Sequence, residues 1–347
     1  MKSTNKIKFF GDFTTGENYQ SGYDVNLRIN VLRQYGYDSL MEQVKGFFEN
    51  SYNIVNLESP ITNCTKSGLM GKKSVLHWTD PVVVPSFMKK YGIDAASLGN
   101  NHAWDYELEG LKQTIESLDN VDIKHFGAGI DVESAKAPLQ QTFEIGSHKL
   151  NLYVFGGYKY KQEYVEEFDF YARKNKGGVF KLVPEDSCAD IHLIKEEDPD
   201  AFIVMYPHFG FDLLNKAEHQ VEYAKAWIDA GADMVIGHGP HLLNQIEYYK
   251  DKPIIYALGV FIFPVNFRYA VNEYCAVCEV EFVEDNGKLK PITRLYPLHF
   301  DNGSFTPVTR PVNDDEIEGF ISTLTNDEPE IKNRIKVYKG CIYCIEL

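Results

Sequence analysis

Short apolar runs recur along much of the chain, and each is ended by a polar or glycine-containing segment. Five of these runs have the composition of buried strands: Ile7–Phe10, Ile54–Val55, Ala95–Leu98, Phe202–Met205 and Met234–Ile236. Apolar runs stopped by a turn signal are typical of parallel strands that are covered on both faces. The pattern therefore predicts buried, parallel strands spread over more than half of the sequence.

Stretches with helical periodicity lie between several of these apolar runs. Residues Tyr106–Leu118 and Ala217–Ala230 place apolar side chains on one face, and the second stretch is followed by Gly231, a common helix stop. A further strand is predicted over Lys149–Phe155. Strands that alternate with helices indicate βα units, so the predicted class is α/β with a layered core.

The last part of the chain changes to β-hairpin patterning. Strands are predicted over Cys275–Phe282 and Lys288–Leu298, with Gly287 at the turn between them. We interpret these strands as additions, over about residues 270–347, to a core of about residues 7–263. The expected organisation is one domain over residues 1–347.

Residues 157–200 fit neither pattern, because aromatic and charged side chains are mixed there before Gly177-Gly178. This segment is interpreted either as a lid or substrate-side insertion, or as a solvated connection between two strands. The sequence leaves both interpretations open.

Composition narrows the range of functions. The chain has 347 residues, 44% hydrophobic and 24% charged, which is ordinary for a globular protein, and its formal net charge is −15. Such a charge argues against nucleic-acid binding, which rests largely on clustered Lys and Arg. No signal-peptide pattern and no apolar run of membrane-spanning length is present. We therefore expect no membrane span and a cytoplasmic location.

The six cysteines include two C-x-x-C pairs, which invites a zinc-ribbon interpretation. However, Cys275 and Cys278 lie on a predicted strand, where residues three apart face opposite sides. Both thiolates of a zinc knuckle must face one side. Buried free thiols in a reducing compartment are the favoured interpretation.

Potential metal ligands stand where the apolar runs end. They are Asp12, Glu58, Asn101, His208, His238 and His241. In an open α/β sheet, ligands bind at the carboxyl ends of the strands, so these side chains can converge. Mixed oxygen and nitrogen donors suit Mn, Fe or Zn better than Ca or Mg. The pattern predicts one or two divalent ions, with His102 beside them as a group that can protonate a leaving group.

Each of these residues also has an ordinary structural interpretation. Asp12 could cap a turn, Asn101 could cap the following helix, and His208 alone would more often be a hydrogen-bonded core histidine. It is the combination of such residues at successive strand ends that favours a metal site.

The motifs that carry these residues resemble the bacterial capsule synthesis CapA family, also called the poly-γ-glutamate synthesis family. The matching segments are Gly11-Asp12, Asn56-Leu57-Glu58, Asn100 to Asp105, His208-Phe209-Gly210, Gly237 to His241, Phe126 to Gly129, and Tyr256 to Phe263. The family is a branch of the calcineurin-like metallophosphoesterases. The resemblance therefore implies an α/β/β/α sandwich of two packed mixed sheets flanked by helices.

The resemblance also implies roles for individual residues. Asp12 and His241 would hold one ion, with Glu58 in the bridging place where the superfamily uses Asp. The second ion would be held by Asn101, His208 and His238. His102 matches the catalytic histidine of the superfamily, and Asp105 would orient it or end its loop.

Four features depart from the superfamily or family pattern. Thr14 stands where the superfamily has a metal-binding histidine, and His238 and His241 are separated by two residues instead of one. Asp212 stands where a Glu is expected. Ala257 and Val260 replace a Ser and an Asn. These departures bear on the occupancy of the first metal position and on activity.

Two classes of function follow from the residues and the resemblance. The first is a metal-dependent hydrolase or transferase in the assembly of a surface polymer, attacking a phosphoester or an amide of an anionic polymer or small molecule. Candidate anion-holding groups are Arg173, Lys174 and Arg268. The second is a non-catalytic accessory protein that binds polymer or a polymer-synthase partner through the metal site or its remnant.

Overall fold

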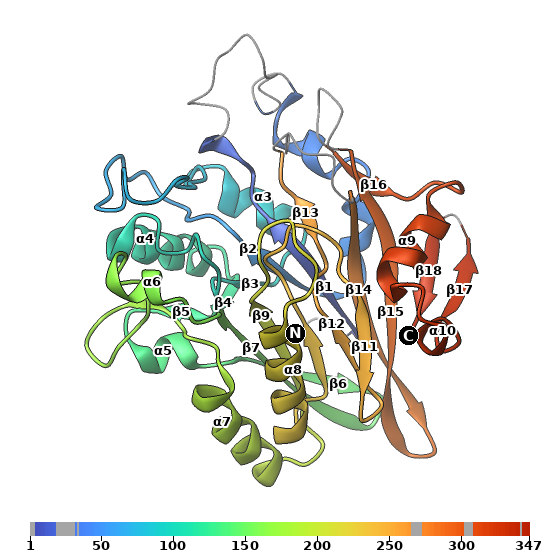
Figure 1. Ribbon diagram of the computed structural model, residues 1–347. Helices are drawn as coiled ribbons and strands as arrows, with labels where there is room; N and C mark the ends of the chain where they lie inside the picture. Colours follow the sequence, from blue (N-terminus) through green and yellow to red (C-terminus); the bar gives the residue numbers. More distant parts are fainter. Residues whose placement is uncertain (1–3, 19–31, 33–34, 265–272, 302–307, 341) are drawn as a thin grey trace.

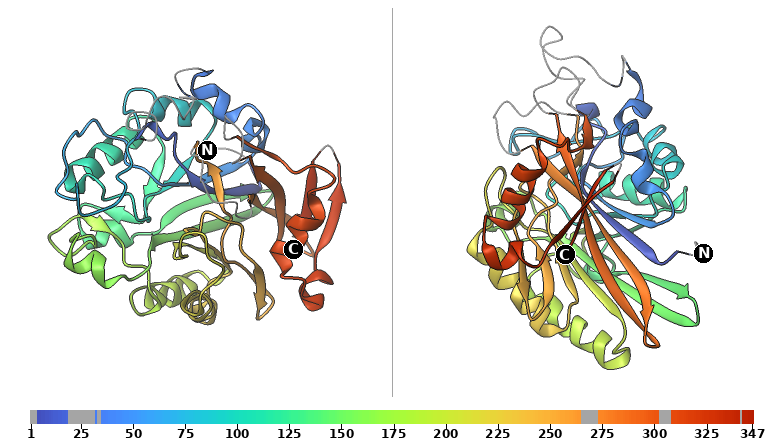
Figure 2. Two further views of the ribbon diagram at one scale, coloured as in Figure 1. Left: turned by 45° about the horizontal axis from the view of Figure 1, so that its top comes forward. Right: turned by 90° about the vertical axis from the view of Figure 1, so that its right-hand side faces the viewer.

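Two mixed β-sheets packed face to face lie at the centre of the computed structural model, which describes residues 4–18, 32, 35–264, 273–301, 308–340 and 342–347. Helices cover the outer face of each sheet, and the left view of Figure 2 shows the resulting four layers. The predicted α/β/β/α sandwich is thereby confirmed.

The first sheet has ten strands in the described part of the chain. Their order is β17 (Lys336–Lys339), β18 (Tyr343–Glu346), β15 (Lys288–Phe300), β14 (Tyr274–Asp285), β1 (Lys6–Phe13), β2 (Tyr52–Leu57), β3 (Ala95–Ser97) and β4 (Lys124–Phe126), with β13 (Val260–Ile262) paired to β1 and β16 (Thr309–Pro311) paired to β15. Strands β1 to β4 are parallel, whereas β14 is antiparallel to β1.

The second sheet has six strands in the described residues. Their order is β11 (Ile246–Tyr249), β12 (Lys252–Ile255), β10 (Met234–Ile236), β9 (Phe202–His208), β7 (His148–Tyr158) and β6 (Leu139–Ile145). The four inner strands are parallel. A separate short pair joins β5 (Ala128–Gly129) to β8 (Gly178–Val179).

The helices divide between the two outer faces and the C-terminal side (Figure 1). They are the 3-10 helices η1 (Tyr37–Met41) and η2 (Lys45–Phe48), and the α-helices α3 (Val84–Lys90), α4 (Glu107–Asp119), α5 (Val132–Lys136), α6 (Gln162–Glu166), α7 (Pro184–Glu197), α8 (Glu218–Ala230), α9 (Ile317–Thr325) and α10 (Pro329–Lys332). Helices α3 and α4 pack on the first sheet, and α7 and α8 pack on the second.

Successive side chains of each inner strand point to opposite faces of its sheet, so they pack into different core layers. Phe9 lies in the core between the sheets, whereas Phe10 lies in the core shared with α3 and α4. On the second sheet, Val204 faces the first sheet and Met205 lies in the core shared with α7 and α8. Because both faces of each inner strand are covered, these strands are continuously apolar, as the sequence indicated.

The predicted strands and helices are present, with bounds that differ by a few residues. One difference concerns β1, which continues through Asp12 to Phe13 instead of ending at Phe10. The reason is that β13 pairs with this end of the strand, joining Asp12 to Val260 and Phe13 to Ile262. Asp12 therefore stands inside a strand, although still at its carboxyl end.

Residues 157–200 contain a helix that the sequence pattern did not reveal. Helix α7 packs against α8, and the Trp227 indole N–H donates to the Ser187 hydroxyl at 2.8 Å. Only Ser187 and Ile191 of α7 are buried, so its apolar face is too narrow to give a clear helical period. This half of the segment is thus a covering helix of the sandwich.

The C-terminal strands join the first sheet. β14 lies beside β1, and Cys275 and Cys278 face the two different cores on either side of β14, as predicted for residues three apart. The pairing of β14 with β1 supports the single-domain organisation, which stays a prediction. Among the described residues, no helix combines the length and the apolar character that crossing a bilayer requires.

The two sheets lie close together at Gly99 and Gly157. A Cβ at Gly99 would lie 2.2 Å from the Gly157 backbone nitrogen, so Gly99→Ala forces the sheets apart. We expect this change to lower the free energy of unfolding by about 2–3 kcal/mol, measured by urea denaturation. Gly46→Ala is the matched control, because a Cβ there meets nothing within 4 Å. Equal stability of the two variants would contradict the close packing.

An ion pair on the C-terminal side gives a pH prediction. Arg310 makes two 2.7 Å hydrogen bonds to Glu316, and this pairing lowers the pKa of Glu316 from 4.5 to about 2. A carboxyl whose pKa is depressed on folding stabilises the protein above its unfolded pKa, and the effect is lost as the pH falls through the folded value. We expect Glu316→Gln to cost roughly 2–3 kcal/mol at pH 6 and little at pH 2. Chemical denaturation at both pH values checks this, and a cost that does not depend on pH would contradict it.

Candidate metal centre

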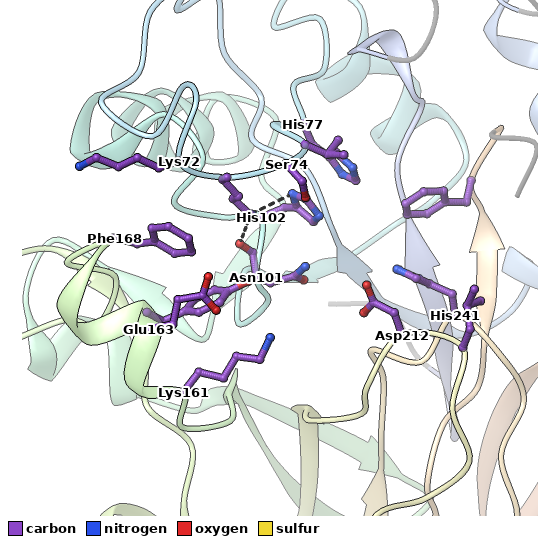
Figure 3. A pocket seen from close by; sticks show the side chains of 15 residues that line it. Lys72, Ser74, His77, Asn101, His102, Lys161, Glu163, Phe168, Asp212 and His241 are labelled. Atoms are coloured by element: carbon purple, nitrogen blue, oxygen red, sulfur yellow. Dashed lines mark hydrogen bonds between the residues drawn. The ribbon is translucent and has the colours of Figure 1, made fainter.

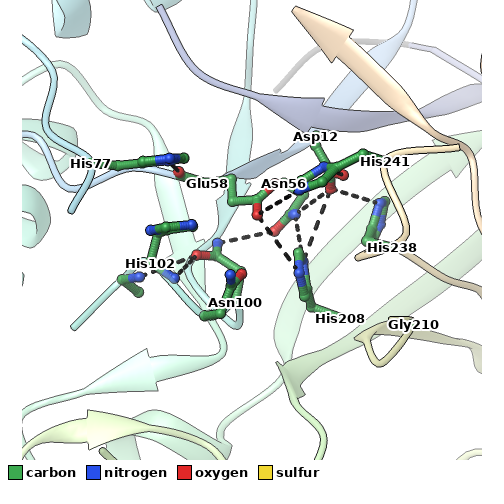
Figure 4. Close-up of polar contacts among 12 residues, drawn as sticks. Asp12, Asn56, Glu58, His77, Asn100, His102, His208, Gly210, His238 and His241 are labelled. Carbon is green, nitrogen blue, oxygen red and sulfur yellow. Dashed lines mark hydrogen bonds and ion pairs between the residues drawn. The ribbon is translucent and has the colours of Figure 1, made fainter. Parts of the chain in front are cut away.

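The predicted ligands from both sheets meet at one rim of the sandwich. Asp12 lies on β1, Glu58 directly follows β2, and Asn101 follows β3; His208 ends β9, and His238 and His241 follow β10. Figure 4 shows the acidic and imidazole groups among them pointing toward a common centre. The convergence follows from the topology, because the carboxyl ends of the parallel strands of both sheets lie on the same side.

Asp12, Glu58 and His241 form the tightest group. One ligand atom from each lies within 4.8 Å of the other two, so the three can hold a metal ion between them. His241 Nδ1 is 3.0 Å from Asp12 Oδ2, and its Nε2 is 3.8 Å from Glu58 Oε1. His241 has a φ of 59°, a left-handed conformation that is uncommon for a non-glycine residue and often found at functional sites.

Two further histidines border this triad. His208 Nε2 is 3.7 Å from Glu58 Oε1, and His208 Nδ1 is 4.0 Å from Asp12 Oδ1. His238 Nδ1 is 3.7 Å from the same Asp12 oxygen. Glu58 thus lies between His208 and His241, which supports its expected bridging place.

Several buried polar atoms at this centre lack hydrogen-bond partners among the described residues. They are both carboxylate oxygens of Glu58, Oδ1 of Asn101, and both ring nitrogens of His238. Buried polar groups are normally hydrogen-bonded, so several unpartnered atoms among the predicted ligands require an explanation. A bound divalent ion is the explanation that fits this donor set.

Burial sets the electrostatics of the centre. Burial, reinforced by the nearby Asp12, raises the pKa of Glu58 well above its ordinary value. Burial also opposes the charge of Asp12, but the hydrogen bond with His241 and the charge of that ring outweigh it and hold the pKa of Asp12 below its ordinary value. Burial would lower the pKa of His241, yet Glu58 and Asp12 together raise it to about 10. Burial lowers the pKa of His238 to about 4 and that of His208 well below its ordinary value. Two buried carboxylates thus require positive charge beside them, which either the His241 ring or a divalent ion can supply.

A chain of side-chain amides fixes Asp12. Asn100 Oδ1 accepts from the backbone N–H groups of His102 and Ala103, and its Nδ2 donates to Asn56 Oδ1 at 3.1 Å. Asn56 Nδ2 then donates to Asp12 Oδ1 at 2.8 Å. The chain links β3, β2 and β1, so it holds the carboxylate in one orientation.

His102 lies at the edge of the centre in a separate polar network. Its Nδ1 is 2.6 Å from Asp105 Oδ2, and Lys73 Nζ is 2.5 Å from Asp105 Oδ1 and 2.7 Å from the Asn101 carbonyl oxygen. Because a carboxylate oxygen at this distance accepts, the proton is assigned to Nδ1, which leaves Nε2 available to a substrate. Burial, followed by the charge of Lys73, lowers the pKa of His102 well below its ordinary value.

His77 supports the His102 ring. The two imidazoles stack with centroids 3.5 Å apart and an interplanar angle of 1°. The His77 backbone N–H donates to Asp105 Oδ2 at 2.6 Å, and its Nδ1 is 2.9 Å from the Glu58 carbonyl oxygen. His77 therefore restrains both His102 and Asp105.

A cavity of about 450 Å³ opens beside this network (Figure 3). Asn101, His102 and His241 line its inner end, and Lys72 and Lys161 line its outer part. A substrate in this cavity, which we call the larger cavity, would contact both the metal centre and His102.

The predicted anion-holding residues lie elsewhere. Arg173 pairs with Asp169 and lines a different cavity, and Lys174 is exposed. Arg268 lies outside the described residues. The role of these three residues in substrate binding stays a prediction, but the lysines that line the larger cavity are Lys72, Lys73 and Lys161.

The departures from the superfamily pattern have local explanations. The Thr14 hydroxyl accepts a 3.2 Å hydrogen bond from the Gly16 backbone N–H and so serves a turn. Ala257 and Val260 are buried. Asp212 lines the larger cavity. The altered spacing of the last two histidines still brings His241 to Asp12 and Glu58.

Sequence reasoning missed several residues of this region. Lys73 and His77 come from an irregular segment without periodicity, and no local signal identifies them. Lys159 directly follows β7 and Lys161 comes two residues later, so the signal that identified the metal ligands, a polar residue after a buried strand, could have found them. Asn56 belongs to one of the motifs named above, but it can join Asn100 to Asp12 only because β3, β2 and β1 are neighbours.

A two-sheet sandwich with carboxylate, amide and imidazole donors at one rim defines the metallophosphoesterase-like class of proteins. Within this class, the model of the bacterial capsule synthesis protein PGA_cap family matches residues 6–265. The chain belongs to this family, which acts in the biosynthesis of capsules and poly-γ-glutamate, and the predicted family is confirmed.

Three curated relatives agree with this assignment. The chain is 27% identical to the capsule biosynthesis protein CapA of Bacillus anthracis over 317 residues, covering 87% of this chain and 73% of the relative. It is 30% identical to the PGA biosynthesis protein CapA of Bacillus subtilis (strain 168) over 264 residues, covering 75% and 66%. It is 29% identical over 214 residues to a Mycobacterium tuberculosis protein named as a probable polyglutamine synthesis accessory protein, covering 59% and 54%.

Proposed function

We propose that this protein is a metal-dependent hydrolase that acts on a phosphoester or an amide in the biosynthesis of a poly-γ-glutamate-type surface polymer. The observation that carries the proposal is the Asp12–Glu58–His241 triad, whose ligand atoms lie within 4.8 Å of one another and whose Glu58 oxygens have no hydrogen bond from any described residue. The adjoining cavity gives a substrate access to this triad.

The donor set indicates which residues would hold the ion. Asp12, Glu58 and His241 would bind one ion, and Glu58 with Asn101, His208 and His238 would bind a second. Mixed carboxylate, amide and imidazole donors favour Mn, Fe or Zn. A divalent ion bound there supplies Lewis-acid activation of water and stabilises developing negative charge.

His102 is proposed to move the proton. Asp105 accepts the proton of Nδ1, so Nε2 is the ring nitrogen that would exchange a proton with water and substrate. The low pKa of the ring means that it starts neutral, so it takes a proton from the attacking water and passes it to the leaving oxygen or nitrogen. Lys73 and His77 keep the ring and Asp105 in place during this transfer.

Metal analysis combined with two substrates tests the proposal. We expect protein loaded with Mn to bind one to two equivalents and to hydrolyse an aryl phosphate or a γ-glutamyl anilide. Chelation should remove the activity, and Mn, Fe or Zn should restore it. Protein that binds no transition metal, or that binds metal and cleaves neither substrate, would contradict the hydrolase proposal.

A second candidate function is a non-catalytic accessory protein that binds polymer or a polymer-synthase partner. It is favoured by Thr14, whose hydroxyl is used in a turn where the superfamily has a histidine ligand. One relative also carries the name of an accessory protein. Polymer binding without turnover at any metal loading would support this candidate over the first.

A further inference from the structure

Two cavities meet beside the metal centre. The larger cavity contains His102 and His241, and a smaller cavity of about 230 Å³ contains His208 and Lys159. Three residues line both cavities: Asn101, Lys161 and Asp212. Of the candidate metal ligands, His241 lines the larger cavity, His208 lines the smaller one, and Asn101 lines both.

Lys161 is the cation at this junction. Its ammonium group lies 5.0 Å from the centre of the Tyr164 ring. No carboxylate oxygen of the described residues lies within 4.0 Å of the Lys161 Nζ, the limit for an ion pair. Figure 3 shows its side chain extending into the larger cavity toward Asn101 and Asp212. An ammonium group in a concave site, without a carboxylate of its own, is available to an anionic ligand.

The other lysines near the junction are already used. Lys73 contacts Asp105 and the Asn101 carbonyl, and Lys159 donates to the Gly210 carbonyl oxygen and lies over the Phe211 ring. This difference identifies Lys161 as the side chain that would change partner when a substrate enters.

The charge around the junction favours an anion. In the smaller cavity the two lysines, Lys159 and Lys161, outnumber the one carboxylate, Asp212. In the larger cavity Lys72 and Lys161 balance Glu163 and Asp212, because Lys73 is paired with Asp105. The chain as a whole has a formal charge of −15, so the positive excess of the smaller cavity is local. A cleft of one sign concentrates ligands of the opposite sign.

We propose that Lys161 binds an oxyanion, a carboxylate or a phosphate, of an extended substrate that runs from the larger cavity across Asn101 into the smaller one. The bond next to this oxyanion lies at the metal centre, and units on either side of it occupy the two cavities. This inference rests on the proposed function in that the substrate reacts at the metal centre. It adds that the substrate is a chain bound on both sides of the reacting bond.

Binding of defined oligomers to the Mn-loaded protein tests the inference. We would titrate γ-linked glutamate oligomers of one to six residues, and polyphosphates of similar length, by calorimetry into wild type and Lys161→Met. We expect the substitution to weaken binding of the matching oligomer about ten- to hundred-fold, since a charge-assisted hydrogen bond is lost. Lys161→Arg should retain most of the affinity.

Lys288→Met is the matched control, because Lys288 is exposed and lies outside the linings of both cavities. It should bind like wild type. If binding of the γ-linked glutamate oligomers depends on Lys161, the oxyanion is a carboxylate. If binding of the polyphosphates depends on it, the oxyanion is a phosphate. If Lys161→Met binds both series as tightly as wild type, or if wild type binds neither, the inference is overturned. If a six-residue oligomer binds no more tightly than a single unit, the two-cavity path is overturned.

Turnover is measured separately and distinguishes the two proposals. Binding that depends on Lys161, without any hydrolysis, would overturn the proposed hydrolase function and leave this anion site intact. If Lys161→Met hydrolyses an oligomer with unchanged kcat and KM, the anion site is overturned and the proposed hydrolase function stands.

Discussion

Replacing Glu58 with glutamine is expected to remove metal from the Asp12–Glu58–His241 triad and to lower turnover by at least about a thousand-fold. Glu58 lies 3.7 Å from His208 Nε2 and 3.8 Å from His241 Nε2, so its carboxylate is the donor shared by both halves of the centre. A neutral amide in its place supplies neither the charge nor the second equivalent oxygen. Metal content by elemental analysis and the rate of ester or amide hydrolysis measure the two effects.

The same substitution is expected to raise the Tm of the metal-free protein by a few degrees. Glu58 is fully buried, neither of its oxygens has a hydrogen bond from the described residues, and a buried carboxylate that lacks hydrogen bonds is costly. Metal should then raise the Tm of wild type but not that of Glu58→Gln.

Glu163→Gln is the matched control for Glu58→Gln. Glu163 lines the larger cavity but is exposed and is not a candidate ligand. It should retain metal and most of the activity. If Glu58→Gln kept its metal, the triad would not be the binding site. If both variants lost activity equally, the effect would come from the charge of the cavity instead of from coordination.

Replacing His102 with alanine is expected to lower kcat by about 10²- to 10⁴-fold while metal content stays unchanged. His102 contacts Asp105 and Lys73 and lines the larger cavity, but it is not part of the triad. Steady-state kinetics, together with elemental analysis of the same sample, separates loss of proton transfer from loss of the ion.

His125→Ala controls for the loss of an imidazole outside the centre, because His125 lies on β4 and pairs with Asp119. It should leave kcat and metal content as in wild type. Loss of metal in His102→Ala would make His102 a ligand instead of a proton carrier. An unchanged kcat would exclude it from proton transfer in the rate-limiting step.

Much of the sandwich could be predicted because its inner strands are buried on both faces. The runs at Ala95–Leu98 and Met234–Ile236 are short, apolar and ended by glycine-containing turns, and they become β3 and β10. The helices at α4 and α8 carry clear amphipathic periods. Parallel strands place their carboxyl ends together, so the predicted ligands converged although they are far apart in sequence.

The remaining features depend on contacts between segments that carry no local pattern. Lys73 and His77 reach Asp105 from an irregular loop, and the Asn100–Asn56–Asp12 chain exists only because β3, β2 and β1 are neighbours. Helix α7 was missed because its buried face is narrow. The extension of β1 past Phe10 depends on β13, which comes more than two hundred residues later.

The close contact of Gly99 with Gly157 has a consequence for ion binding under the proposed function. Asp12, Glu58 and Asn101 lie on or shortly after strands of one sheet, whereas His208, His238 and His241 lie on or shortly after strands of the other, and the glycine contact limits the gap between them. A donor set that is already spaced spends little of its affinity on assembling itself. Loading and release of a divalent ion would then be local events at this rim, and the metal-free protein would keep the shape needed for recapture.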